Sequence, residues 1–261
     1  LLVASFQQSD HCINSIMAGI VVIFDFDQTI VDVDSDNWVI GELGFTDLAN
    51  HLLPTMPWNS VMDKMTREMH QQGKTIDDII GALKRVPVVS NVISAIKSAH
   101  ALGCELRVLS DANLFFIETV LEHLGVRSYF SEINTNSGSV DEEGRLRISP
   151  YHDFTRASHG CTLCPPNMCK GLIMERIQAS IAKEASTKKF IYVGDGIGDY
   201  CPSMKLKESD FLMPRKNFPL LGLISKNPVV VKAEMHEWID GDQLERHLVA
   251  TIEKITSPGC N

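Results

Sequence analysis

The chain has 261 residues, 44% of them hydrophobic, and a formal net charge of −9. This length and composition suit one large domain or a core domain with a small insert. A chain this acidic is not expected to bind nucleic acid, and no apolar run approaches the length needed to cross a bilayer. We therefore expect neither nucleic acid nor a membrane as partner, and the sequence carries no indication of oligomeric state.

The N-terminal segment stands apart from the rest of the chain. Residues 1–16 show no clear periodicity, and they lack the basic start and long apolar core of a secretory signal peptide. The stretch that starts at Met17, MAGIVVIFDFD, would be a natural beginning. We therefore interpret residues 1–16 as an extraneous or disordered extension.

Short apolar runs with the character of buried strands recur at residues 20–24, 105–109, 190–193 and, more weakly, 211–213. Helical stripes lie between them, such as the one formed by Ile117, Val120, Leu121 and Leu124. The polar, glycine-containing residues 131–150 favour a hairpin, and a weak amphipathic helix is expected after residue 232. Strands that alternate with helices predict an α/β fold with a doubly wound, mostly parallel sheet.

One stretch interrupts this alternation. It contains no strand-like run and instead carries two helical stripes, in residues 61–69 and 76–83, with Thr75 as the expected N-cap of the second. Its length is that of a compact subdomain. We therefore predict a core domain formed by residues 17–36 and 86–255. Residues 37–85 would form a small helical insert.

Polar side chains follow three of the predicted strands directly. These are Asp25 and Asp27 after the first, Ser110 and Asp111 after the second, and Asp195 and Asp199 after the third. In open α/β sheets, ligands bind beyond the carboxyl ends of the strands, so these side chains are expected to converge. Each pair alone is more often a turn or a loop, but their succession favours a functional site. Hard oxygen ligands in this number suit Mg²⁺, which also binds phosphate.

Four motifs in this order resemble those of the haloacid dehalogenase (HAD)-type phosphatases. They are DFDQT at 25–29, Ser110 behind a strand, Lys170 at the start of a helix, and GDGIGD at 194–199. The stretches DVDSDNW, SDAN, CPPNMCKG and GDGIGDYCP resemble the phosphoethanolamine/phosphocholine phosphatase family. LLPTMPWNS and MPRKNFP are similar to its plant branch, which includes thiamine phosphate phosphatase-like proteins and phosphate-starvation-induced pyrophosphatases. The resemblance implies a Rossmann-like HAD core with a helical cap between the first two motifs.

The roles that this resemblance implies also fit the needs of phosphoryl transfer, in which cations must neutralise the phosphate and the attacking carboxylate. Asp25 would be the nucleophile that forms an aspartyl-phosphate, and Asp27 would act first as acid and then as base. Ser110 and Lys170 would be catalytic residues that also bind the phosphate oxygens. The implied Mg²⁺ site contains Asp25, Asp27 through its backbone carbonyl, Asp195 and Asp199.

Three further aspartates lie where the chain leaves the core for the insert. By resemblance, Asp36 and Asp111 face the leaving-group pocket, where relatives that favour aminoalcohol phosphates meet a cationic head, and Trp38 would add an aromatic face. We interpret Asp32 and Asp34 as solvated linker charges. The implied substrates are thiamine monophosphate, an aminoalcohol phosphate, pyridoxal phosphate and inorganic pyrophosphate. The acidic entrance favours a cationic leaving group, whereas pyrophosphate would need extra metal to approach.

Seven cysteines, an odd number in a chain without a recognisable secretory signal, indicate reduced thiols and a cytoplasmic location. Three of them, Cys161, Cys164 and Cys169, crowd into nine residues just before Lys170. They are either reduced thiols that shape this loop and make the enzyme sensitive to oxidation, or zinc ligands. The fourth zinc ligand would then be His152, His159 or Cys201.

The leading interpretation is therefore a Mg²⁺-dependent phosphoric monoester hydrolase or pyrophosphatase that acts on a small phosphorylated metabolite. A phosphomutase would use the same fold, and an assay for free phosphate discriminates it from a phosphatase. A catalytically inactive zinc-binding module is the alternative from another class. It is disfavoured by an intact set of catalytic residue types: Asp25, Asp27, Ser110, Lys170 and Asp195.

Overall fold

A computed structural model describes residues 19–182 and 188–257, so the expected extension at residues 1–16 lies outside the described residues. Its sheet has seven strands in the order β4-β3-β2-β1-β5-β6-β7, all parallel to their neighbours except β4. The strands are β1 (Ile20–Phe24), β2 (Glu105–Asn113), β3 (Phe130–Val140), β4 (Leu146–Ser149), β5 (Lys189–Gly194), β6 (Phe211–Pro214) and β7 (Glu234–Met235).

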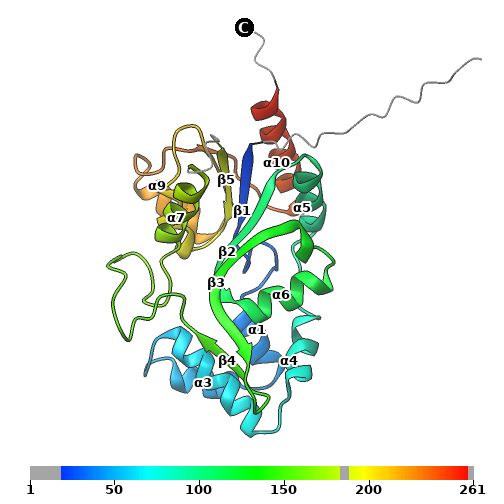
Figure 1. Ribbon diagram of the computed structural model, residues 1–261, viewed down its shortest axis with the longest axis vertical. Helices are drawn as coiled ribbons and strands as arrows, with labels where there is room; N and C mark the ends of the chain where they lie inside the picture. The colour runs from blue at the N-terminus through cyan, green and yellow to red at the C-terminus, as the bar shows by residue number, and fades with distance from the viewer. Residues whose placement is uncertain (1–18, 183–187, 258–261) are drawn as a thin grey trace, which may run out of the picture.

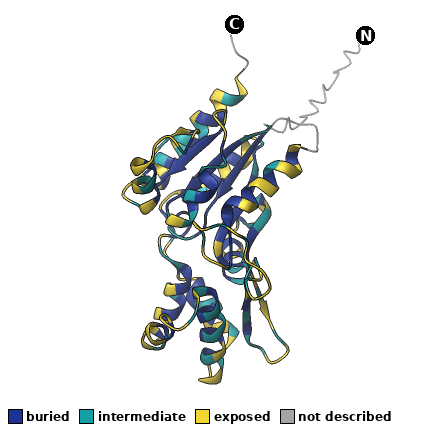
Figure 2. Cartoon of the chain, turned by 90° about the vertical axis from the view of Figure 1, so that its left-hand side faces the viewer, coloured by how far each residue is buried: buried dark blue, intermediate teal, exposed yellow. Residues whose placement is uncertain are grey.

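Helices cover both faces of this sheet (Figure 1). Alternate residues of β1 point to opposite faces, because Val22 and Phe24 belong to one hydrophobic cluster and Val21 and Ile23 to the other. The first cluster includes α5 (Val92–Ala101), α6 (Leu114–His123) and α10 (Gly241–Thr256). The second includes α7 (Lys170–Ala182) and α9 (Pro219–Lys226). The predicted doubly wound α/β fold is therefore confirmed, and Figure 2 shows the buried strands between helices whose outer faces are exposed.

Between β1 and α5 the chain, which is described throughout this stretch, forms four helices and no strand. They are α1 (Ser35–Glu42), α2 (Thr46–Leu52), α3 (Trp58–Gln71) and α4 (Ile76–Leu83). Helix α1 begins two residues before the expected insert because the Asp34 carboxylate caps it, accepting from the Asn37 amide at 2.8 Å. Thr75 caps α4 as predicted, with a reciprocal bond from its amide to Asp78.

The chain leaves the sheet for these helices and returns to it at one place. Val31 and Val88 form an isolated antiparallel bridge, and the Asp32 amide donates to the Pro87 carbonyl at 2.8 Å. The two crossings therefore lie side by side, and α1, α3 and α4 lie below the sheet in Figure 1. This arrangement supports the proposed division into a core and a helical cap.

The expected hairpin is formed by β3 and β4, which pair in antiparallel register from Ser137 with Ser149 to Val140 with Leu146. Its second strand contacts α3. The Asp63 carboxylate accepts bonds of 2.9 Å from Nε and from Nη2 of Arg147, and one of 3.0 Å from the Ile148 amide. The hairpin thus joins the core sheet to the longest helix of the cap.

Shorter elements complete the described chain: α8 (Tyr200–Ser203) and two 3₁₀ turns, η1 (Arg127–Tyr129) and η2 (Ile197–Asp199). The amphipathic helix expected after residue 232 is α10, whose apolar face packs on α5. Within residues 19–182 and 188–257, no helix combines the length and the apolar character needed to cross a membrane.

Candidate active site

The predicted site residues converge at the carboxyl ends of three adjacent parallel strands. Phe24 at the end of β1 pairs with Val108 of β2 and Val193 of β5, so the residues that follow meet at one edge of the sheet. Carboxylate oxygens of Asp25, Asp195 and Asp199 lie within 4.8 Å of one another. The convergence that the sequence pattern suggested is therefore present in the structure.

One strand boundary differs from the expected one. Strand β2 does not end at Leu109 but continues to Asn113, so Ser110 and Asp111 lie inside its last residues rather than behind it. The pairing with β3 shifts register between Leu109 and Asn113, where Asn113 pairs with Asn136. This irregularity lets three polar residues and Ala112 extend a strand whose apolar part is complete.

Lys170 is the central cation of the site. Its side chain is 3% exposed, and its ammonium nitrogen lies 2.7 Å from Oδ2 of Asp25 and 3.0 Å from Oδ1 of Asp199. A third carboxylate, that of Asp111, is 3.8 Å away. Burial would lower the pKa of Lys170, but attraction to Asp199 and Asp25 outweighs it and raises this pKa well above its usual value. Lys170 is therefore charged, so it can stabilise anionic oxygens.

The carboxylate of Asp199 is fully engaged. Its Oδ1 accepts from Lys170 and from the Tyr192 hydroxyl at 2.7 Å, and its Oδ2 accepts from the amides of Asp195 and Gly196, both at 2.9 Å. Burial favours the neutral acid, but Lys170 and these hydrogen bonds lower the pKa of Asp199 below its ordinary value. Asp199 thus holds Lys170 in place as a buried anion, with both oxygens already paired.

A close approach of backbone to carboxylate makes this arrangement possible. A Cβ atom on Gly194 would lie 2.6 Å from Cγ of Asp199. Only glycine leaves room there, because real Cβ atoms do not approach a carboxylate so closely. Steric exclusion of any side chain therefore explains why the first residue of GDGIGD is glycine in this chain.

The charges of the buried cluster do not balance. With all three carboxyl groups ionised, Asp25, Asp195 and Asp199 would carry three negative charges against the single positive charge of Lys170, which would leave two uncompensated. Burial, and then repulsion from Asp199, raise the pKa of Asp25 well above its usual value and that of Asp195 to about 7. A divalent cation between Asp25 and Asp195 would supply the two missing charges, so the donor set fits Mg²⁺ in charge as well as in ligand type.

A small cavity of about 230 Å³ opens beside this cluster. Its lining contains four carboxylates, one amide and one indole, from Asp27, Asp34, Asp36, Asp111, Asn37 and Trp58. Asp27 lies two residues after Asp25, and its Oδ1 accepts a hydrogen bond from the Ser35 amide at 3.0 Å. Burial, followed by repulsion from Asp34 and Asp36, raises the pKa of Asp27 well above its usual value.

Asp36 and Asp111, which the resemblance predicted to face the leaving group, both line this cavity. Asp36 is buried, and its Oδ2 accepts from the Trp58 indole at 2.7 Å, whereas its Oδ1 is a buried oxygen with no partner among the described residues. Burial, and then repulsion from Asp34, raise the pKa of Asp36 to about 8. Asp111 is half-exposed and faces Lys170 as well as the cavity.

Two expectations about neighbouring residues are wrong, and a third is incomplete. Asp32 is exposed as expected, but it also pairs with Arg215 at 2.7 Å. Asp34 is not a free linker charge, because it caps α1 and lines the cavity. Trp38 is not the aromatic wall, because its indole nitrogen donates to the Ala82 carbonyl at 2.9 Å inside the cap. The wall is Trp58, which opens α3 and lies within the plant-like stretch LLPTMPWNS.

Two supporting residues were missed in the sequence. Thr29 donates to Oδ1 of Asp195 at 3.1 Å, and it is the last residue of the DFDQT motif. Tyr192 bonds Asp199 from within an apolar strand, where only the alternation of strand faces could have drawn attention to it.

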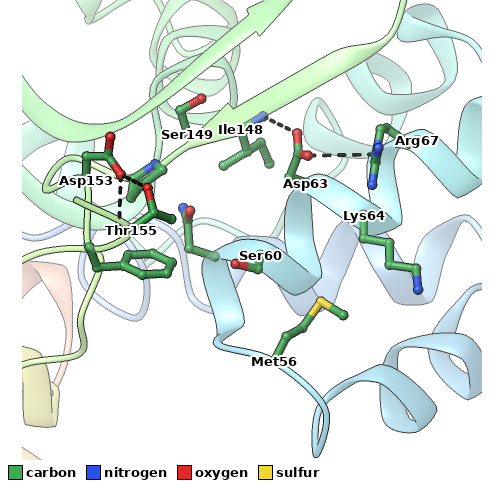
Figure 3. Close-up of a pocket in the computed structure, with 12 residues that line it drawn as sticks. Met56, Ser60, Asp63, Lys64, Arg67, Ile148, Ser149, Asp153 and Thr155 are labelled. Carbon is green, nitrogen blue, oxygen red and sulfur yellow. Dashed lines mark hydrogen bonds and ion pairs between the residues drawn. The ribbon is translucent and has the colours of Figure 1, made fainter. Parts of the chain in front are cut away.

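A second and larger cavity, of about 520 Å³, lies between α3, the end of β4 and the loop after it (Figure 3). Its lining includes Met56, Ser60, Lys64, Ser149 and Thr155. None of the strand-end carboxylates lines it. The smaller cavity is therefore the one placed for chemistry, although it is the less spacious of the two.

Comparison with known proteins agrees with this geometry. A protein family described as "Putative Phosphatase" matches residues 20–252. An "Inorganic pyrophosphatase 2" of Arabidopsis thaliana is 65% identical over 239 residues, which is 92% of this chain and 86% of that protein. A "Thiamine phosphate phosphatase-like protein" of the same plant is 50% identical over 240 residues, 92% of this chain and 98% of that protein.

The fold has solved counterparts as well. A substrate-bound phosphoserine phosphatase matches 87% of this chain and 97% of its own, with a TM-score of 0.57 and 17% identity, a likeness of fold alone. The sequence matches confirm the predicted resemblance to HAD-type phosphatases, and the solved structure confirms the fold. The chain belongs to this phosphatase family and is a HAD-type phosphatase of the branch that includes the plant pyrophosphatases and thiamine phosphate phosphatase-like proteins, acting on phosphorylated small molecules.

Proposed function

We propose that the chain is a Mg²⁺-dependent phosphohydrolase that transfers the phosphoryl group of its substrate to Asp25 and then to water. The observation that carries the proposal is the position of Lys170, buried between Asp25 and Asp199 at 2.7 and 3.0 Å, beside an acidic cavity. A buried carboxylate with a fixed cation next to it, at the edge of a parallel sheet, has the features of a nucleophile for phosphoryl transfer.

The residues that would hold Mg²⁺ are Asp25, Asp195 and the backbone carbonyl of Asp27. When bound, the ion supplies positive charge that lets an anionic nucleophile approach an anionic phosphate. The sequence pattern also suggested Asp199 as a ligand. The Asp199 carboxylate already accepts four hydrogen bonds. We therefore propose instead that Asp199 orients Lys170 and does not coordinate the metal directly, so that it acts on the metal site only through the residues that it contacts.

The chain's own groups then divide the work of the reaction. Asp25 attacks the phosphorus atom, and Lys170 stabilises negative charge on the phosphate oxygens. Ser110 is buried, and among the described residues its hydroxyl oxygen accepts only from the Ala112 amide, at 3.3 Å. Its hydroxyl proton can therefore be donated to a phosphate oxygen.

Asp27 is placed to move the protons. Burial and the neighbouring carboxylates raise the pKa of Asp27, which favours the protonated form that a general acid for the leaving group must have. After the leaving group departs, the resulting carboxylate can take a proton from the water that attacks the aspartyl-phosphate. The hydrogen bond from the Ser35 amide fixes the side chain toward the cap, from where the leaving group would enter.

For the substrate we propose inorganic pyrophosphate first. Two plant relatives named as inorganic pyrophosphatases are 65% and 64% identical over 92% and 88% of the chain. The cavity of about 230 Å³ is small, which suits a phosphate leaving group. Pyrophosphate that enters with a bound divalent cation would also carry less charge toward the four carboxylates of the cavity.

A second candidate is a phosphate ester of a cationic alcohol, such as thiamine monophosphate or phosphocholine. The acidic lining and the indole of Trp58 favour it, because carboxylates and an aromatic face together bind cationic head groups. A relative named as a thiamine phosphate phosphatase-like protein is 50% identical.

The experiment is phosphate release, with and without Mg²⁺, from pyrophosphate, thiamine monophosphate, phosphocholine and pyridoxal phosphate. Mg²⁺-dependent release that is lost in Asp25→Asn supports the mechanism, and the compound with the highest kcat/KM names the leaving-group pocket. Conversion of a sugar phosphate to its isomer without free phosphate would favour a phosphomutase. Unchanged release in Asp25→Asn would contradict the proposed nucleophile.

A further inference from the structure

A second cluster of ligand-type side chains lies behind Lys170, apart from the carboxylates. The sulfur atoms of Cys161, Cys164, Cys169 and Cys201 all lie within 4.8 Å of one another. Three come from the loop that connects β4 to α7, and the fourth comes from α8, which follows the GDGIGD motif. All four thiols are free, and those of Cys169 and Cys201 are buried.

The spacing of the sulfurs matches that of a tetrahedral metal site. Cys161 and Cys201 have their sulfurs 3.8 Å apart, and Cys169 and Cys201 have theirs 3.9 Å apart. A zinc ion with four Zn–S bonds of about 2.3 Å requires sulfur–sulfur edges of about 3.8 Å. A disulfide requires about 2.0 Å, so the four thiols are spaced for a shared ion rather than for a covalent pair.

The histidines of the same loop do not compete as ligands. Nε2 of His159 lies 2.9 Å from the Pro165 carbonyl, and its Nδ1 accepts from the Cys161 amide at 3.1 Å. His152 packs against the ring of His159 and does not belong to the cluster. Of the three candidates for a fourth ligand, Cys201 is the one whose sulfur lies in the cluster. It follows Cys169 by 32 residues in the sequence.

The start of a helix faces the cluster. Helix α7 begins at Lys170, and the backbone amides of Gly171 and Leu172 in its first turn face the sulfurs of Cys201 and Cys169. Unpaired amides at a helix N-terminus stabilise negative charge. Gly171 has no room for a Cβ atom against the Cys201 sulfur, so α7 and α8 touch at this point.

We propose that these four cysteines bind one structural Zn²⁺ ion. Four thiolates complete the tetrahedron and leave no open position for a water or substrate, so the ion has no part in catalysis. The ion instead fixes the positions of neighbouring residues. Cys169 precedes Lys170 directly, and Cys201 follows Asp199 by two residues, so the ion clamps both halves of the Lys170–Asp199 pair. The effect on activity, but not the zinc site itself, rests on the proposed role of Lys170.

The first test measures zinc by mass spectrometry in protein purified without chelator. One zinc per chain is expected in the wild-type protein and in Cys104→Ser, which removes a buried free thiol outside the cluster. Cys164→Ser and Cys201→Ser should lose most of it. A mercurial reagent added to the wild-type protein should release the zinc as the four thiols of the cluster react. This measurement uses no variant, so misfolding of a variant cannot affect it.

Cobalt distinguishes this site from the carboxylate cluster. Zinc-free protein refilled with Co²⁺ should show the intense sulfur-to-cobalt charge-transfer absorption of a tetrahedral thiolate site, which oxygen ligands do not give. This absorption should persist in Asp25→Asn and vanish in Cys201→Ser.

The proposal is overturned if the four thiols of the cluster react as free thiols in active protein that neither holds zinc nor takes up cobalt with this absorption. A disulfide within the cluster of the active protein would overturn it equally. A protein that holds zinc on these sulfurs but releases no phosphate would contradict the proposed function and leave the zinc site standing.

Discussion

The ammonium nitrogen of Lys170 lies 3.0 Å from Oδ1 of Asp199, and both side chains are buried. Asp199 in turn accepts two backbone amides and the Tyr192 hydroxyl. The position of the cation therefore depends on an anion that is itself fixed by three other donors. A residue of this kind contributes to catalysis through the group that it orients.

Replacing Asp199 by Asn should lower kcat, because Lys170 would lose its anchor while the Tyr192 and amide partners keep the fold. We expect a loss of about 10²- to 10³-fold in kcat, the range found when one preorganised donor of a transition-state site is removed. Steady-state kinetics of phosphate release measure it. The matched control is Tyr192→Phe, which removes one hydrogen bond to the same oxygen and should cost far less. Equal losses in both variants would contradict a specific role of the Lys170–Asp199 pair.

The cavity charges should set the preference between anionic and cationic leaving groups. Changing Asp111 to Asn should raise KM for thiamine monophosphate or phosphocholine and lower it for pyrophosphate, by roughly two- to five-fold because this carboxylate is half-exposed and screened. KM values for both substrate types in parallel test this. Glu42→Gln, in an exposed ion pair elsewhere in the cap, is the control and should leave both KM values unchanged. Shifts of the same sign for both substrate types would exclude an electrostatic cause.

The carboxyl group of Asp36 should make stability fall with rising pH. Its pKa is about 8 in the folded chain, against 3.8 for the free side chain. Between these values the folded chain keeps a proton that the unfolded chain has lost, so the free energy of unfolding decreases as pH rises through this window. Melting temperatures from about pH 5 to about pH 9 should therefore drop less in Asp36→Asn, which retains an oxygen for the Trp58 indole. Parallel curves for the two proteins would show that Asp36 ionises normally.

The contact between the cap and the hairpin is predicted to affect substrate binding more than the chemical step. Asp63 of α3 accepts from Arg147 twice and from the Ile148 amide, with its side chain 19% exposed. Asp63→Ala should loosen this docking, at a cost of roughly 1–2 kcal/mol in unfolding free energy, and should raise KM more than it lowers kcat. Denaturant unfolding and kinetics measure the two effects. A fall in kcat alone would indicate that α3 acts on the reacting groups and not on closure of the cap.

How far the fold was predictable differs from element to element. Strands β1 and β5 were readable because their apolar runs are buried on both faces, as parallel strands between two helix layers must be. The extension of β2 through Ser110 to Asn113 was not, because its three polar residues and one alanine carry no strand signal and the pairing depends on Asn136 of β3. Strand β7 has two exposed residues and is defined by its neighbour β6 alone.

The site shows the same division. Motif order placed Asp25, Lys170 and Asp195 together, because the topology of a parallel sheet brings strand ends to one edge. It could not show which aromatic residue of the cap, Trp38 or Trp58, turns toward the cavity, since helix rotation is decided by packing. Nor could it select Cys201 as the fourth thiol, which reaches the cluster from a different element.

The most direct test of the central claim is to trap the phosphorylated residue. Wild-type protein is mixed with pyrophosphate and Mg²⁺, quenched during turnover and reduced with borohydride, which converts an aspartyl-phosphate to homoserine; peptide mass spectrometry then locates the change. The account predicts homoserine at position 25, dependent on substrate and Mg²⁺ and absent from Asp25→Asn. Active enzyme with no modification at Asp25, or with the phosphoryl group on another residue, would contradict it.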